Sequence, residues 1–161
     1  LLDAFRTACQ SSAPAIENLI HSTFVVAAEI ANSRAAREST RLVHALVQLN
    51  EATRANSDWL AAMAIQLRRV AAQGDLLGEV EPDAAAEVLV AATTGVLLMS
   101  SELSGGADLP ARLLRMWRIL LPALVPEQSI AYLREFVDRE PLRRIEPSAS
   151  QPGGPADHVV K

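Results

Sequence analysis

The sequence predicts an all-α fold, a helical bundle of antiparallel helices around one hydrophobic core. Apolar residues recur three and four positions apart along most of the chain, and no stretch shows the alternation typical of a strand. Half of the 161 residues are hydrophobic and the net charge is -4, as in an ordinary globular domain. A chain of this length buries a sizeable core without a disulfide or a structural metal.

The first three predicted helices are delimited by serines and a proline. Residues 1–10 have the pattern of the end of a helix. Pro14 suits the first turn of a second helix, because a missing N–H costs nothing there, and this helix runs over residues 14–32. Ser33 is a suitable cap for a third helix, arginine-rich at first and then apolar, over residues 33–49.

The next two helices are separated by glycine and proline signals. The run Asn56-Ser57-Asp58 predicts the start of a helix that Gly74 ends. Pro82 then opens a helix that lacks charge over residues 88–101 and that Gly105-Gly106 ends. This stretch is shorter than the roughly 20 residues that cross a bilayer, so we expect a helix surrounded by other helices or by a partner chain and no membrane contact.

The last helices begin at Asp108 and at Pro126. The first of them carries Pro122, where we expect a kink, and has an apolar seam suited to packing on another helix. The residues of this seam are Leu109, Leu113, Trp117, Leu120 and Leu124. After residue 140 the composition turns to Pro, Gly and Ser, so residues 141–161 are expected to form a disordered tail.

Catalytic and metal-binding patterns are missing from the sequence. His21, His44 and His158 lie far apart, and Cys9 is the single cysteine, which we expect to be a small buried side chain. No phosphate-binding loop or nucleophile motif occurs. The acidic balance also argues against nucleic-acid binding by this chain itself. We therefore expect no enzyme activity, no cofactor, no metal site and a cytoplasmic location.

Two features suggest a binding site for an apolar molecule. Trp59 offers a flat apolar face and an indole N–H, although a tryptophan is commonly part of the core. Thr93 and Thr94 lie in an otherwise apolar helix, where a hydroxyl either orients a ligand or bonds the carbonyl one turn back. Trp117 is different, because its leucine-rich seam favours an interface or core role over a ligand contact.

Four segments together resemble the C-terminal regulatory domain of TetR-family transcriptional repressors, over residues 1–138. They are Asn56-Ser57-Asp58-Trp59-Leu60, residues 67–75, residues 81–96 with Thr93-Thr94-Gly95, and residues 108–122. The combination is most similar to the γ-butyrolactone autoregulator receptor branch of actinomycetes. Nothing in the sequence resembles the family's N-terminal helix-turn-helix domain.

The resemblance implies a division of the chain and a set of site residues. Residues 1–10 would end the helix that connects to a DNA-binding domain absent from this sequence, and residues 13–140 would bind ligand and dimerise. A small apolar, γ-butyrolactone-like signal would bind beside Trp59, Met63, Phe24, Thr93, Thr94 and Leu98. A homodimer would form through residues 88–103 and 109–124, with Leu97, Leu113, Trp117, Leu120 and Leu124 in the interface.

These implications lead to one expected function and one alternative. The chain would be the regulatory domain of a repressor that releases operator DNA when the signal binds, with DNA contacted only through the absent domain. The alternative is an all-α dimerisation or interaction module that binds no small molecule, with Trp59 in its core.

Overall fold

The computed structural model describes residues 1–32 and 50–143, with the side chains of 50–56 left undescribed. All regular elements within these ranges are helical, which confirms the all-α prediction. The predicted helix over 33–49 and the tail from residue 144 lie outside the described residues. The elements are α1 (Leu2–Ala8), α2 (Ala15–Asn32), α4 (Asn50–Ala72), α5 (Pro82–Ser104), α6 (Leu109–Leu124), α7 (Glu127–Arg139) and the short 3₁₀ helix η1 (Glu140–Leu142).

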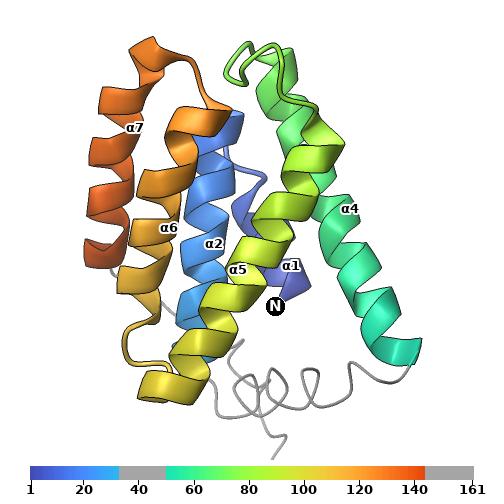
Figure 1. Ribbon diagram of the computed structural model, residues 1–161, viewed down its shortest axis with the longest axis vertical. Coiled ribbons are helices and arrows are strands. Elements are labelled where there is room, and N and C mark those ends of the chain that lie inside the picture. Colours follow the sequence, from blue (N-terminus) through green and yellow to red (C-terminus); the bar gives the residue numbers. More distant parts are fainter. Residues whose placement is uncertain (33–49, 144–161) are drawn as a thin grey trace, which may run out of the picture.

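Helix α2 is the central element of the bundle. It contacts α1, α4, α6 and α7, and most of its side chains are buried. Helices α6 and α7 lie side by side on one flank of α2, and α5 crosses in front of it between α6 and α4 (Figure 1). Because α5 packs on both α4 and α6, it joins the two halves of the domain.

The ends of α5 follow from local chemistry, as the sequence predicted. The Glu81 carboxylate accepts a hydrogen bond of 2.7 Å from the backbone N–H of Ala84, and Pro82 occupies the first turn, where no N–H is needed. At the other end Gly105 has φ 63°, a left-handed conformation that glycine adopts without strain. These residues fix the length of α5 at 23 residues.

The start predicted for the fourth helix was wrong. Helix α4 begins at Asn50, so Asn56, Ser57 and Asp58 lie inside it and do not mark its start. These residue types favour caps because their side chains compete for backbone hydrogen bonds, but the penalty in a helix interior is small. Trp59 therefore lies in the middle of a long helix and does not follow a cap.

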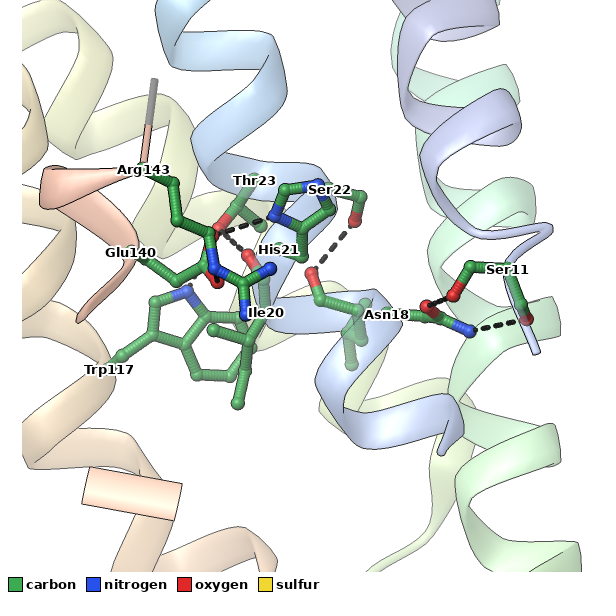
Figure 2. A network of polar contacts seen from close by, with 10 residues as sticks. Ser11, Asn18, Ile20, His21, Ser22, Thr23, Trp117, Glu140 and Arg143 are labelled. Carbon is green, nitrogen blue, oxygen red and sulfur yellow. Dashed lines mark hydrogen bonds and ion pairs between the residues drawn. The ribbon is translucent and has the colours of Figure 1, made fainter. Parts of the chain in front are cut away.

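The seam of α6 faces the core of its own chain. Leu113 and Trp117 are fully buried, and Trp117 Nε1 donates a hydrogen bond of 2.9 Å to Thr23 Oγ1 on α2. Thr23 Oγ1 donates in turn to the carbonyl of Ile20 at 2.7 Å (Figure 2). Of the two roles left open for Trp117, the structure supports the core role. Leu113 and Trp117 were predicted in a dimer interface, but both are fully buried within their own chain.

The chain remains ordered slightly beyond the predicted boundary at residue 140. Glu140 begins η1 and its side chain is fully buried, with Oε2 2.7 Å from Nδ1 of His21 on α2. Arg143 Nε lies 3.0 Å from Glu140 Oε1 in an ion pair without hydrogen-bond alignment (Figure 2). The Arg143 guanidinium covers the Phe136 ring, with Cζ 5.1 Å from the ring centroid. Residues 141–143 are thus tied to the bundle and do not belong to a disordered tail.

Helix α5 is apolar but poorly covered by its own chain. Val88, Met99 and Leu103 are 55%, 50% and 69% exposed, which is unusual for large apolar side chains in a helix interior. Among the described helices, α5 has the length and mean hydropathy to cross a membrane, a property that core helices of soluble proteins share. Of the two coverings expected for this helix, other helices of the chain and a partner chain, the first is incomplete, and the outer face of α5 is open.

Candidate functional site

Trp59 lies on the inner side of α4, where it meets the first helix. Its ring is partly buried and contacts the Phe5 ring of α1 edge to face, with centroids 5.3 Å apart and planes at 68°. Such a geometry brings the positive edge of one ring to the negative face of the other. Phe5 is fully buried, so the contact connects the core beneath α1 to the partly open indole ring.

Met63 and Phe24 are part of the single hydrophobic core of the domain, against which the partly buried Trp59 packs. Met63 follows Trp59 by one helical turn on α4, and Phe24 is on α2, beside Thr23 in sequence. Both side chains are almost completely buried. The structure thus places Trp59 and Met63 one turn apart on α4, whereas Phe24 shares with them only the continuous core of the domain.

The threonines of α5 point in different directions. Thr93 Oγ1 lies 3.9 Å from the Met116 sulfur of α6, within reach of a weak hydrogen bond, and is partly buried. Thr94 is exposed, and Leu98, one turn later, is partly exposed and lies outside the buried cluster. Successive residues on a helix are rotated by about 100°. The structure therefore does not group Thr94 and Leu98 with Trp59.

The remaining predicted interface residues divide between core and surface. Leu97 packs on the core cluster, one turn after Thr93, and so faces inward. Leu120 is partly exposed and Leu124 is largely buried at the other end of the α5–α6 pair. Of the five residues assigned to a dimer interface, Leu120 and Leu124 border a surface that is open in this structure.

That open surface contains an apolar groove that the sequence did not reveal. The groove holds about 260 Å³ and lies between the first turns of α5 and the last turns of α6. None of the predicted ligand contacts lines it. Its lining residues are Val80, Glu81, Ala84, Ala85, Val88, Leu89, Leu120, Ala123 and Leu124. Sequence spacing gave no signal, because the groove forms only where two helices diverge.

At the opposite end of the α5–α6 pair, polar groups join the end of α5 to the start of α6. Asp108 accepts hydrogen bonds from Arg112 Nε, Ser104 Oγ and Ser100 Oγ at 2.7, 2.6 and 2.7 Å. These donors, Arg112 first, hold the pKa of the Asp108 carboxyl well below its usual range. In the part of the chain that the structure describes, no group of three His, Cys, Asp or Glu side chains could hold a metal ion.

Cys9 has the properties of a core residue. It is almost fully buried, as the sequence predicted, and burial raises the pKa of its thiol, with a smaller opposing effect of a hydrogen bond with Ser22. A thiol with a raised pKa carries little thiolate and is a poor nucleophile. Cys9 is therefore structural.

Comparison with known protein families shows to which family this helical domain corresponds. Residues 13–126 match the model of the tetracyclin repressor-like C-terminal domain. The chain belongs to this family. The match runs from the start of α2 to the end of α6, so it contains Trp59, the open face of α5 and the groove. The resemblance noted from the sequence is thereby confirmed.

Two relatives of this tetracyclin repressor-like domain are named as receptors. The A-factor receptor protein of Streptomyces griseus is 34% identical over 77 residues, which make up 48% of this chain and 28% of that protein. The crystal structure of an ArpA-like γ-butyrolactone receptor has a TM-score of 0.72 at 22% identity, covering 86% of this chain and 65% of that one.

A further solved relative of the domain was captured on DNA. It is the TetR-family protein CprB from Streptomyces coelicolor in complex with its biological operator sequence, with a TM-score of 0.65 at 22% identity. The alignment covers 86% of this chain and 70% of that protein. The present chain thus spans about a quarter of the curated relative and about two thirds of the solved ones.

Proposed function

We propose that this chain is the regulatory domain of a TetR-family repressor that binds a γ-butyrolactone-like signal and thereby releases operator DNA. The observation that carries the proposal is the partly open Trp59 ring in a family whose relatives include an A-factor receptor and a γ-butyrolactone receptor. Operator binding is assigned to a helix-turn-helix domain outside this sequence, and the location is cytoplasmic.

The apolar surroundings of Trp59 suit a ligand with a short hydrocarbon tail. Phe5, in contact with the indole ring, and Met63, one helical turn later on α4, supply apolar surface near it. A tail of about six carbons contributes on the order of 5 kcal/mol at ~0.8 kcal/mol per methylene, before the costs of association. The indole N–H is then available to orient the lactone oxygens.

The Trp59–Phe5 contact gives the signal a route to the DNA-binding domain. Phe5 belongs to α1, which we assign to the end of the connecting helix. A ligand that moves the Trp59 ring changes the packing of Phe5 and hence the position of α1. The ligand shifts the protein toward the DNA-free state only if it binds that state more tightly than the DNA-binding state.

The open face of α5 supports a homodimer. Val88, Met99 and Leu103 on α5 and Ile119 on α6, which is 75% exposed, make an apolar surface larger than scattered single residues would. A second copy of the chain covers this surface in the proposed repressor, so that two DNA-binding domains are held at a fixed spacing.

The experiment that tests the function is calorimetry with a 2-acyl-γ-butyrolactone carrying a six-carbon acyl chain. We expect the chain to bind this probe and the Trp59→Ala variant to lose binding, because the apolar wall is removed. The control is Ile65→Ala, which removes an exposed apolar side chain from the same helix. Light scattering should show that both variants keep the dimer.

Two results would contradict the proposal. Equal affinity of Trp59→Ala and the unmodified chain removes Trp59 from the ligand site. A chain that dimerises but binds neither this probe nor related butenolides is instead the interaction module without a small-molecule ligand.

A further inference from the structure

Gln66 of α4 is a buried polar side chain that forms no hydrogen bond with the described part of the chain. Its exposed fraction is 7%, and its amide meets no donor or acceptor there. The other buried polar side chains of the described residues each have a partner. These are Asn18, Ser22, Thr23, Ser100 and Glu140.

The Gln66 amide is nevertheless within reach of a small molecule. Among the described residues, Glu140 Oε1 is the one side-chain oxygen or nitrogen that is both fully enclosed and without a hydrogen bond. The amide of Gln66 also lacks a hydrogen bond, so it is not fully enclosed and borders an opening in the packing. A buried amide without a partner costs free energy, and a ligand that bonds it removes this cost.

The position of Gln66 on α4 connects it to Trp59. Trp59, Met63 and Gln66 follow one another at spacings of four and three, so they share one face of the helix. Helical side chains lean toward the N-terminus of their helix, so Gln66 leans toward Met63 and Trp59. The Cα atoms of Trp59 and Gln66 are about 10.5 Å apart at 1.5 Å per residue.

Contacts on both sides of Gln66 place this face of α4 toward α1. Before it along α4, the Trp59 ring meets the Phe5 ring of α1. After it, the charge of Arg69 acts on Cys9 of α1, where burial raises the pKa of the thiol and Arg69 lowers it to a smaller extent. Gln66 therefore lies between two points at which α4 and α1 approach each other.

We propose that Gln66 recognises the lactone ring of the signal, with an amide N–H donating a hydrogen bond to the ring carbonyl oxygen. This inference rests on the proposed function and identifies a specificity-determining residue of that site. A lactone carbonyl only accepts hydrogen bonds, and the glutamine amide supplies two N–H donors. The ring would lie between Trp59 and Gln66, with the hydrocarbon tail along Met63.

The inference is tested by calorimetry with two probes that differ at one group. One is the 2-acyl-γ-butyrolactone with a six-carbon acyl chain, and the other is the 3-acyltetrahydrofuran with the same chain, in which a methylene replaces the ring carbonyl. The unmodified chain should bind the lactone about tenfold or more tightly than the ether, because the ether leaves the Gln66 amide without a partner.

The Gln66→Met variant keeps the length of the side chain and removes its amide. It should bind the lactone about tenfold or more weakly than the unmodified chain, and its affinities for the two probes should be equal within about threefold. Gln128→Met is the matched control, because it makes the same exchange at an exposed position of α7. This control should keep the preference for the lactone.

Thermal unfolding without a probe separates a ligand contact from a structural role. Gln66→Met should keep or raise the midpoint Tm, because no hydrogen bond of the described chain is lost. Gln73→Met is the opposite case, since Gln73 Oε1 accepts a hydrogen bond of 2.7 Å from the backbone N–H of Ala15. Its Tm should fall. A fall of the same size for Gln66→Met would assign Gln66 to the fold and overturn the inference.

The binding results distinguish this inference from the proposed function. If Gln66→Met keeps the preference for the lactone, or if the unmodified chain binds both probes equally, the inference is overturned and the proposed function stands. A chain that binds neither probe contradicts both. Loss of the preference in Gln66→Met, together with an undiminished Tm, supports the inference.

Discussion

A single threonine holds the buried tryptophan of α6 against α2. Thr23 accepts a hydrogen bond of 2.9 Å from the indole N–H of Trp117, whose side chain is fully buried. A buried indole N–H without a partner costs the free energy of its lost hydration. Thr23 therefore holds α6 on α2.

Replacement of this threonine by valine should destabilise the fold by about 1–3 kcal/mol, since Trp117 Nε1 would be left without an acceptor. Urea unfolding measures the change. The same substitution in a Trp117→Phe background should cost less, because no buried donor remains. Thr7→Val, at an exposed position of α1, should change the free energy of unfolding by less than about 0.5 kcal/mol. Equal costs in both backgrounds would show that the hydrogen bond is not the cause.

At the level of residues, the sequence predicted burial correctly where it depends on residue type. It did not predict which way a side chain points from its helix. The burial of Cys9 follows from its small apolar character. Thr93 and Thr94 were equally good candidates, because a one-residue step turns a side chain by about 100° and the absolute orientation of a helix is not in its spacing. Trp117 likewise belongs to an apolar stripe whichever helix covers it.

At the scale of elements, the connection between α5 and α6 is held by charge as well as by its glycines. Asp108, at the start of α6, receives the hydroxyls of Ser100 and Ser104 from α5 and the guanidinium of Arg112. These contacts lower the pKa of the Asp108 carboxyl, so the folded chain keeps it ionised where the unfolded chain takes up a proton.

The sign of this shift predicts a loss of stability in acid. The contribution of Asp108 is fully present above its unfolded pKa of about 3.9 and is lost as the pH falls below that value toward the folded pKa. Between about pH 5 and pH 3, the free energy of unfolding of Asp108→Asn should therefore fall less than that of the unmodified chain. Asp3→Asn, an exposed carboxyl of α1, serves as the control. Parallel pH profiles for the unmodified chain and Asp108→Asn would refute the role of this cluster.

Helix boundaries were predictable where proline or glycine chemistry sets them. Pro82 and Gly105 delimit α5, and Pro126 precedes α7, all close to the predicted positions. The start of α4 was missed because Asn56-Ser57-Asp58 is a favourable cap but only a mildly unfavourable helix interior. A cap signal alone does not show whether a helix has already begun.

On the scale of the whole molecule, the all-α class and the family followed from the sequence, whereas the distribution of apolar surface did not. Periodicity shows that α5 is apolar but not that so much of it stays open in one chain. The groove between α5 and α6 depends on how far two helices diverge, which no sequence pattern encodes. Because this apolar surface is open in a single chain, we expect association of two chains to stabilise the fold.

The thermal midpoint Tm should therefore rise with protein concentration, because mass action favours the proposed dimer, which would stabilise the folded state. Scanning calorimetry over about a hundredfold range of concentration measures the effect. The Leu103→Asp variant should show a smaller dependence. A Tm that does not change with concentration would indicate that the open face of α5 does not contribute to a folded dimer.

The buried carboxylate of Glu140 sets a practical limit on how far the chain can be shortened. It lies between His21 of α2 and Arg143 at the end of the described residues, so it fastens the C-terminal segment to α2. Removal of residues 140–143 would strip His21 of its acidic neighbour and uncover the Phe136 ring. Minimal versions of this domain for crystallisation or ligand screening should extend through Arg143.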